Sequence, residues 1–302
     1  MPKSGEAAES GWLAAAPAVF VLIWSTGFIV ARYGMPHAPP LGFLAVRYAL
    51  SVLAFLVWVT LARAAWPRGR TQWAHLAVAG VLMHAGYLGG VWWAVKIGLG
   101  AGTVALIVSL QPVLTAVWVS VRGHERVNTR QWLGLALGFA GLLLVVERKL
   151  RVGEVTSANL ALALFALASI TAGTLYQKRH VVPGDVRSAN CVQLIAALAV
   201  TAPLAAFEGG SFDLHPELIG AMAWSVLVLT LGGSSLLTLL IQRGAATRVT
   251  GLLYLVPPCT ALMAWLLFRE PLTAGVLAGV ALTAAGVALV VRENQPALGD
   301  KP

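Results

Sequence analysis

The stretch SLQPVLTA, residues 109–116, has a proline in the middle of a long apolar segment, and a similar stretch, YLVPPCTA, follows at residues 254–261. Pro112 and Pro258 are 258 − 112 = 146 residues apart in a chain of 302, close to half its length. Proline removes a backbone donor and clashes with the preceding helical turn. The spacing therefore predicts a duplicated chain in which each half contains one broken helix.

The similarity between the two halves continues downstream of these prolines. HERVNTRQWLGLALGFAGLLLVV at residues 124–146 aligns with REPLTAGVLAGVALTAAGVALVV at residues 269–291. Counted from the glutamate of each half, one glycine lies nine residues on and another sixteen: Glu125, Gly134 and Gly141 in the first half, Glu270, Gly279 and Gly286 in the second. This register favours an internal repeat. We also expect the glycines to allow close packing of helices, as small residues do in membranes.

The composition indicates a membrane protein. Hydrophobic residues make up 58% of the chain and charged residues 11%, against about a quarter charged in soluble domains. A continuous run of about 20 apolar residues is long enough to cross a bilayer as a helix. We therefore predict an all-α integral membrane protein with ten transmembrane helices, at residues 12–31, 41–62, 72–95, 101–122, 130–147, 157–177, 188–207, 217–241, 248–268 and 273–291.

The distribution of Lys and Arg predicts how these spans are oriented. The N-terminus, the C-terminus and the even-numbered loops hold 14 of the 21 Lys and Arg residues, and the other side holds 6. Because cytoplasmic loops carry the excess of positive charge, both termini are expected in the cytoplasm, and the net charge of +9 does not indicate nucleic acid binding. Five spans per repeat is an odd number, so we expect two inverted repeats, residues 1–150 and 151–302.

Four segments carry a resemblance to a known family: WSTGF (24–28), RYALS (47–51), QPVLTAVWVSVRGHERV (111–127) and VPPCTALMAWLLFREPL (256–272). The chain resembles the drug/metabolite transporter superfamily, and within it the EamA-type ten-helix exporters. It is further similar to the bacterial aromatic amino acid exporters called YddG. The resemblance implies export across the bacterial inner membrane by alternating access. It also implies that the third span lines a central cavity between the halves.

Polar residues within the spans are the candidates for a substrate site, because such residues are costly in a bilayer. All twelve Asp and Glu residues lie in tails, loops or span ends, which argues against strong proton coupling. His84 lies near the middle of its span, and Tyr87 and Trp92 follow at spacings that predict one shared helix face. These rings suit a zwitterion with a large side chain. Alternatively, His84 bonds a neighbouring helix and Trp92 lies at the lipid interface.

The remaining candidates come from both halves. Arg47, about six residues into its span, either snorkels to the interface or pairs with a substrate carboxylate. The other predicted substrate-binding residues are Trp24, Gln111, Ser234, Thr238 and Tyr254. For serine and threonine the alternative is a hydrogen bond to the backbone of their own helix. Predicted hinges or helix breaks beside the cavity, or packing kinks as the alternative, are Pro112, Pro257 and Pro258.

These features predict a secondary transporter that exports amino acids, both aromatic and other neutral ones, by facilitated or weakly proton-coupled transport. The alternative is an exporter of drugs or hydrophobic cations, although such transporters usually hold an acid within the membrane. The sequence has no HExxH, DDxxD or GxSxG motif, so we expect no enzyme activity, no cofactor and no metal. The expected partners are the lipid bilayer and a small-molecule substrate, and the protein is expected to be a monomer.

Overall fold

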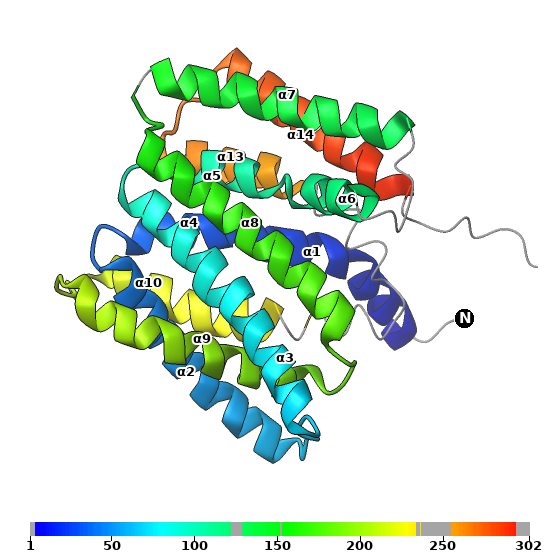
Figure 1. Ribbon diagram of the computed structural model, residues 1–302, viewed down its shortest axis with the longest axis vertical. Helices are drawn as coiled ribbons and strands as arrows, with labels where there is room; N and C mark the ends of the chain where they lie inside the picture. Colours follow the sequence, from blue (N-terminus) through cyan, green and yellow to red (C-terminus); the bar gives the residue numbers. More distant parts are fainter. Residues whose placement is uncertain (1–3, 122–128, 152, 234–235, 237–254, 294–302) are drawn as a thin grey trace, which may run out of the picture.

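The structure, a computed structural model, describes residues 4–121, 129–151, 153–233, 236 and 255–293. These residues form α-helices, two π-helices and connecting turns, and no β-strand occurs among them. The predicted all-α fold is therefore confirmed for this part of the chain. Figure 1 shows the helices stacked in layers, with α7 and α14 at one edge and α2, α3 and α9 at the opposite edge.

The helices follow the order expected from the apolar segments. The first half contains α1 (Ser4–Gly34), α2 (Pro40–Leu61), α3 (Arg70–Gly80), η1 (Val81–Gly86), α4 (Tyr87–Lys96), α5 (Ala101–Val108), α6 (Gln111–Val121) and α7 (Thr129–Arg151). The second half contains α8 (Ser157–His180), α9 (Val186–Glu208), α10 (Pro216–Ala223), η2 (Trp224–Gly232), α13 (Val256–Phe268) and α14 (Ala274–Glu293). Each of the ten predicted spans overlaps one or more of these elements.

Apolar length marks some of these helices as membrane spans by itself. Among the described residues, four helical stretches are long and apolar enough to cross a bilayer: Pro40–Leu61, Arg70–Lys96, Ser157–His180 and Val186–Glu208. The other apolar helices there are shorter: Ala18–Gly34, Ala101–Thr115, Pro216–Gly232, Val256–Phe268 and Ala274–Leu289. The short lengths arise partly where a predicted span is broken or runs beyond the described residues.

Two predicted spans contain π-helical turns that the sequence did not indicate. The helix predicted over residues 72–95 is α-helical only at its ends, with the π-helix η1 at residues 81–86 between α3 and α4. The span predicted over residues 217–241 likewise continues from α10 into the π-helix η2. Shifted by the 146 residues between the two prolines, residues 81–86 fall on 227–232, inside η2. The same position of each half is therefore π-helical, and π-turns within helices frequently occur at functional sites.

The helix predicted over residues 101–122 is divided at the first proline motif. The helix α5 ends at Val108 and α6 begins at Gln111, so Pro112 is the second residue of α6. Pro257 and Pro258 are the second and third residues of α13. Proline is tolerated in the first helical turn because the backbone donors there have no intrahelical acceptor. Both motifs therefore begin a helix in the structure.

Equivalent helices of the two halves pack against each other. The contacts pair α2 with α9, α5 with α13, and α7 with α14, which are the second, fourth and fifth spans of each half. The first span of each half packs against the third span of the other: α1 contacts α10 and η2, and α8 contacts α3, η1 and α4. Figure 1 shows α7 and α14 running side by side. Each contact between the halves is therefore matched by one in which the two halves exchange roles, the pattern that an approximate two-fold axis produces.

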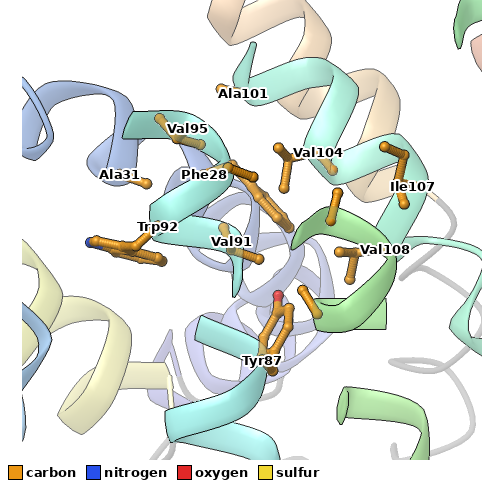
Figure 2. Packing of buried hydrophobic residues seen from close by; sticks show 14 of the residues in the cluster. Phe28, Ala31, Tyr87, Val91, Trp92, Val95, Ala101, Val104, Ile107 and Val108 are labelled. Carbon is orange, nitrogen blue, oxygen red and sulfur yellow. The ribbon is translucent and has the colours of Figure 1, made fainter. Parts of the chain in front are cut away.

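A contiguous apolar core lies where α1, α4 and α5 meet. Phe28, Val91, Val104 and Ile107 belong to one cluster of buried hydrophobic residues, as does Trp92. Figure 2 shows Phe28 between Val91 and Val104, with the Trp92 ring on the other side of α4. Burial of such side chains stabilises a bundle by dispersion contacts, because lipid removes most of the hydrophobic driving force between helices. This core fixes α4 relative to the broken fourth span.

The helices α7 and α14 approach closely along the glycines that the repeat predicted. A Cβ atom built on Gly141 would lie 2.5 Å from the carbonyl oxygen of Gly279, and one built on Gly279 would lie 2.7 Å from that of Gly141. Gly286 in turn lies against the backbone of Gly134 and Gly138. The expected close packing through small residues is confirmed, because any larger side chain at these positions would overlap the opposite backbone.

Carboxylates cap the N-termini of two helices, α2 and α5, at one end of the bundle. We call this the odd-loop end; it comprises residues 35–39, 97–100, 153–156, 209–215 and 269–273. Glu208 accepts hydrogen bonds from the amides of Leu41 and Gly42 at the start of α2. Glu270 accepts one from Ala101 at the start of α5, 3.1 Å long. A carboxylate satisfies the free amides of a helix N-terminus and also interacts favourably with its dipole.

We expect Gly141→Ala to destabilise the protein. The added methyl group would overlap the Gly279 carbonyl and Thr283, and overpacking of this kind costs about 1–3 kcal/mol. Thermal unfolding in detergent measures the change. Gly220→Ala in α10 is the matched control, because a Cβ there meets no atom within 4 Å. Equal melting temperatures for Gly141→Ala and wild type would contradict the close packing of α7 and α14.

We also expect Tyr48→Phe to weaken the packing of α2 on η1. The Tyr48 hydroxyl is buried with its residue and donates to the backbone carbonyl of His84 at 2.9 Å. Losing one such hydrogen bond costs about 0.5–1.5 kcal/mol. Unfolding midpoints of Tyr48→Phe and Tyr33→Phe give the comparison, since Tyr33 packs its ring on Phe268. If both variants lost the same stability, the hydrogen bond to His84 would have no specific role.

Candidate functional site

Arg47 is buried in the interior of the bundle. Its side chain lies on α2 with 7% of the residue exposed, and its Nη2 donates to Thr230 Oγ1 of η2 at 3.2 Å. The Nε and Nη1 groups have no hydrogen-bond partner in the part of the chain that the structure describes. The snorkelling alternative is wrong, because the guanidinium turns toward the opposite half and not toward a lipid interface.

Trp92 lies against this guanidinium. The Arg47 Cζ atom is 5.6 Å from the centre of the Trp92 ring, a distance at which the cation is attracted by the ring face. Trp92 is 1% exposed, and its indole Nε1 has no hydrogen-bond partner among the described residues. Its expected alternative location at the lipid interface is therefore wrong. The ring is instead part of the interior, where it covers the charge of Arg47.

His84 is held in the π-helix η1 beside these two residues. Its ring meets the Tyr48 ring edge-on with 6.2 Å between centroids. Its Nε2 atom is buried and has no hydrogen-bond partner in the described chain. The Arg47 charge is close enough to interact electrostatically with the His84 ring, and Gln193 of α9 also faces that ring. The wider π-turn thus places an imidazole nitrogen without a hydrogen-bond partner near the guanidinium of Arg47, whose Nε and Nη1 groups also lack one.

Tyr87 lies on a different side of α4 from Trp92. Figure 2 shows the Tyr87 ring directed toward Val91 and Val108, whereas the Trp92 ring leaves the helix on the other side. The prediction of one shared face for His84, Tyr87 and Trp92 needs this correction, because Tyr87 and Trp92 are five residues apart within the regular helix α4, a rotation of about 140° at 3.6 residues per turn. Tyr87 is 8% exposed.

Three polar residues of this region were not selected from the sequence. Ser51 follows Arg47 by four residues on the same face of α2, and its buried hydroxyl has no described partner. Ser225 of η2 also has a buried hydroxyl without a hydrogen-bond partner among the described residues. Thr230 donates to the Ser225 carbonyl at 2.8 Å while it accepts from Arg47. The spacing of arginine and serine in RYALS was the available signal for Ser51, whereas nothing local identified Ser225 or Thr230.

Other predicted residues lie outside this region. Trp24 is 40% exposed and packs on Phe20, with ring centroids 5.5 Å apart. Gln111 donates to Thr174 Oγ1 at 2.8 Å, which joins the start of α6 to α8. Thr174 also donates to the Ile170 carbonyl of its own helix, the backbone alternative expected for threonine. The remaining predicted residues, which fall outside the described residues, are Ser234, Thr238 and Tyr254.

We call the group formed by Arg47, Ser51, His84, Trp92 and Ser225 the central polar cluster. Every member has at least one buried polar atom without a hydrogen-bond partner in the described structure. A guanidinium presents its donors in a planar fork that matches a carboxylate, and an ionised partner makes these bonds stronger than neutral ones. The described residues place no Asp or Glu in a salt bridge with Arg47. The arrangement can therefore bind an anionic group within the bundle.

Comparison with known proteins supports transport. The chain matches the model of the EamA-like transporter family twice, over residues 11–147 and 158–292. A probable amino-acid metabolite efflux pump of Salmonella typhimurium is 25% identical over 277 residues, covering 88% of this chain and 90% of that protein. The uncharacterized transporter YvbV of Bacillus subtilis is 28% identical over 280 residues, covering 90% of this chain and 89% of that protein.

Two further similarities bear on location and fold. The uncharacterized inner membrane transporter YedA of Escherichia coli is 26% identical over 212 residues, covering 69% of this chain and 66% of that protein. A solved crystal structure of a protein with 16% sequence identity superimposes with a TM-score of 0.62, covering 92% of this chain and 96% of that chain. The fold is therefore shared, and because the two family matches together span most of the sequence, the chain belongs to the EamA-like transporter family of membrane transport proteins.

Proposed function

We propose that this protein exports amino acids and that Arg47 binds the substrate carboxylate. The observation that carries the proposal is the buried guanidinium with two unpaired donor groups, Nε and Nη1. A lone charge in an apolar interior is strongly unfavourable unless a counter-charge is supplied. A carboxylate supplies that charge and accepts two parallel hydrogen bonds. The neighbouring rings of Trp92 and His84 provide the apolar and aromatic surface that a large neutral side chain requires, and Tyr87 is proposed to extend it from the other side of α4.

We further propose that the halves are two inverted five-helix repeats that rock around this cluster. Three features support that organisation: the exchange of contacts between the halves, the π-helices at equivalent positions, and the two matches to the family model. Alternating access in such transporters exposes one central site to each side in turn. Pro112, Pro257 and Pro258 are the proposed hinge positions. The excess of Lys and Arg assigns both termini to the cytoplasm of a bacterial inner membrane protein.

Facilitated export is the mechanism that fits the charges of the bundle. The described acidic residues lie at helix ends or in loops, so none stands beside Arg47 to carry a coupling proton. His84 is the titratable group of the central polar cluster that could give weak proton linkage. The resemblance to YddG exporters and the amino-acid pump among the relatives support aromatic and other neutral amino acids as substrates.

A hydrophobic-cation exporter is the second candidate. An unpaired guanidinium repels a cationic substrate, and no described carboxylate lies near it to compensate. Like charges brought together in a binding site cost several kcal/mol. The amino acid proposal is therefore preferred, and we propose the monomer as the transporting unit.

We expect Arg47→Gln to abolish recognition of the carboxylate. Hydrogen bonds to a charged group contribute about 1.5–3 kcal/mol, so amino acid counterflow should fall by about 10- to 100-fold. Counterflow of labelled phenylalanine and leucine into proteoliposomes measures the loss. The wild type should also discriminate against phenylalaninamide, which lacks the carboxylate, by a similar factor. Arg47→Gln should lose this discrimination.

The matched control is Arg151→Gln at the exposed end of α7. Arg151 forms an ion pair with Glu147, and its side chain is 75% exposed. Its counterflow should equal that of the wild type. If wild type and Arg47→Gln transported phenylalanine and its amide at equal rates, Arg47 would not be the carboxylate-binding residue.

We expect counterflow to proceed without a pH gradient. Proteoliposomes with the same pH on both sides should exchange amino acid at the full wild-type rate, and an imposed gradient should drive no accumulation above equilibrium. A small gradient-driven accumulation that disappears in His84→Ala would assign weak coupling to that residue. Transport that requires the gradient in both wild type and His84→Ala would contradict facilitated export.

A further inference from the structure

Two loops that are distant in sequence meet through a group of histidines and carboxylates at the odd-loop end. His37, between α1 and α2, contacts Asp213 and Glu217, which precede and begin α10. The His37 Nδ1 atom is 3.0 Å from Asp213 Oδ2, and its Nε2 atom is 3.1 Å from Glu217 Oε2. The ring of His215 stacks on that of His37 with 4.3 Å between centroids and 5° between planes.

The protonation of His37 follows from these contacts. Both ring nitrogens face a carboxylate, and both donate only in the imidazolium form. Hydrogen bonds to Asp213 and then to Glu217 raise the pKa of His37 above its usual value. The folded state therefore favours the protonated ring. The contact stabilises the folded protein fully below the unfolded pKa of about 6.5, and this stabilisation is lost as pH rises through the raised pKa.

We propose that His37, His215 and Glu217 form a binding site for Zn²⁺, with Asp213 orienting the His37 ring. One ligand atom from each of these three residues lies within 4.8 Å of the others. Tetrahedral zinc with nitrogen and oxygen ligands at 2.0–2.2 Å separates its ligand atoms by roughly 3.4 Å. The observed separations of 3.1 Å from His37 Nε2 to Glu217 Oε2 and 4.0 Å from His215 Nδ1 to the same oxygen bracket that value. The half-exposed His215 ring, which stacks parallel to that of His37, turns on metal binding to direct its Nδ1 lone pair at the ion.

The ligand types and their surroundings favour zinc over magnesium or calcium. Imidazole nitrogens suit first-row transition metals, whereas magnesium and calcium prefer oxygen ligands alone. Asp213 bonds the other nitrogen of the His37 ring, as outer carboxylates commonly do around zinc-binding histidines. The His37 side chain is 15% exposed, and those of Glu217 and His215 are 48% and 46% exposed. Water can therefore reach the site and complete the coordination.

Zinc binding exchanges one proton for the metal. The His37 Nε2–H bond to Glu217 is replaced by a bond from Nε2 to the metal, and the proton leaves to solvent. His215 Nδ1, when it ligates, gives up a 3.3 Å hydrogen bond from the Glu217 amide. Two further charged groups lie at this loop: Lys96 of α4 donates to the carbonyls of Met35 and Ala38, and Glu208 accepts from the amides of Leu41 and Gly42. Because protons compete with the metal for these ligands, zinc affinity should fall at acidic pH.

The experiment measures Zn²⁺ binding to the purified full-length protein after removal of any affinity tag. Isothermal titration at pH 7.5 should show one Zn²⁺ per chain, and Zn²⁺ should raise the melting temperature. His215→Ala should lower the affinity at least 10-fold. Asp213→Asn should lower it less, because Asp213 orients a ligand without binding the metal. No binding by the wild type, or equal affinity in His215→Ala, would overturn the site.

The control distinguishes this site from the other histidine cluster. His75, Tyr176 and His180 form a stacked group between α3 and α8, with His75 Nδ1 2.8 Å from the Tyr176 hydroxyl. His180→Ala should leave the Zn²⁺ affinity unchanged, and a loss of affinity in His180→Ala alone would overturn the proposal. Equal melting temperatures of metal-free wild type and His215→Ala would exclude a folding defect.

The site would also regulate transport, an extension that rests on the proposed function. His37 belongs to the first half and the other ligands to the second, so a bound ion joins the halves at the odd-loop end. Zn²⁺ on that side should slow counterflow by wild type but not by His215→Ala. Binding without any slowing would contradict rocking of the halves about the central polar cluster while leaving the metal site intact, whereas absent binding refutes the site itself.

Discussion

The unpaired guanidinium of Arg47 is the constraint on which the interior of the bundle depends. Leaving a buried charge without its counter-charge costs about 3–5 kcal/mol in proteins, so its neighbours must limit that cost. Trp92 covers the cation with its ring face, and Thr230 accepts one hydrogen bond from the opposite half. Neither supplies a negative charge. The interior is thus stable enough to fold but remains complementary to an anion, which is the condition that a reversible carboxylate site requires.

The π-helices explain how this interior is built from long apolar helices. A π-turn inserts extra backbone per turn and leaves groups for side chains to satisfy. In η1 the His84 carbonyl accepts from Tyr48, and in η2 the Ser225 carbonyl accepts from Thr230. Both compensating hydroxyls lie next to Arg47, Tyr48 by sequence and Thr230 by contact. Thr230 of η2 therefore bonds the guanidinium directly, whereas η1 is joined to α2 through the hydroxyl of Tyr48, the residue that follows Arg47.

The sequence predicted local features better than contacts between the halves. The apolar segments, the helix break near Pro112 and the glycine packing of α7 with α14 depend on residue type and spacing, which are visible in one chain. Arg47 and Thr230 are 183 residues apart, and His37 and Asp213 are 176 apart. No pattern in a single sequence pairs such positions. The shared helix face of His84, Tyr87 and Trp92 was wrong because Tyr87 and Trp92, five residues apart in α4, are separated by about 140° around the helix.

Glu270, the glutamate of the second repeat motif, caps the N-terminus of α5 in the other half. Glu270 accepts from Ala101 at the start of α5, and Glu154 accepts from Gly100 and Thr103 while it pairs with Lys149. The helix α5 has only eight residues before the break at Ser109, so its first amides are a large share of its backbone and need such acceptors. These carboxylates, bonded to amides, a hydroxyl and a lysine, hold the start of the broken span in place. Glu154, Glu208 and Glu270 thus serve the fold, and no described acid forms a salt bridge with the central Arg47.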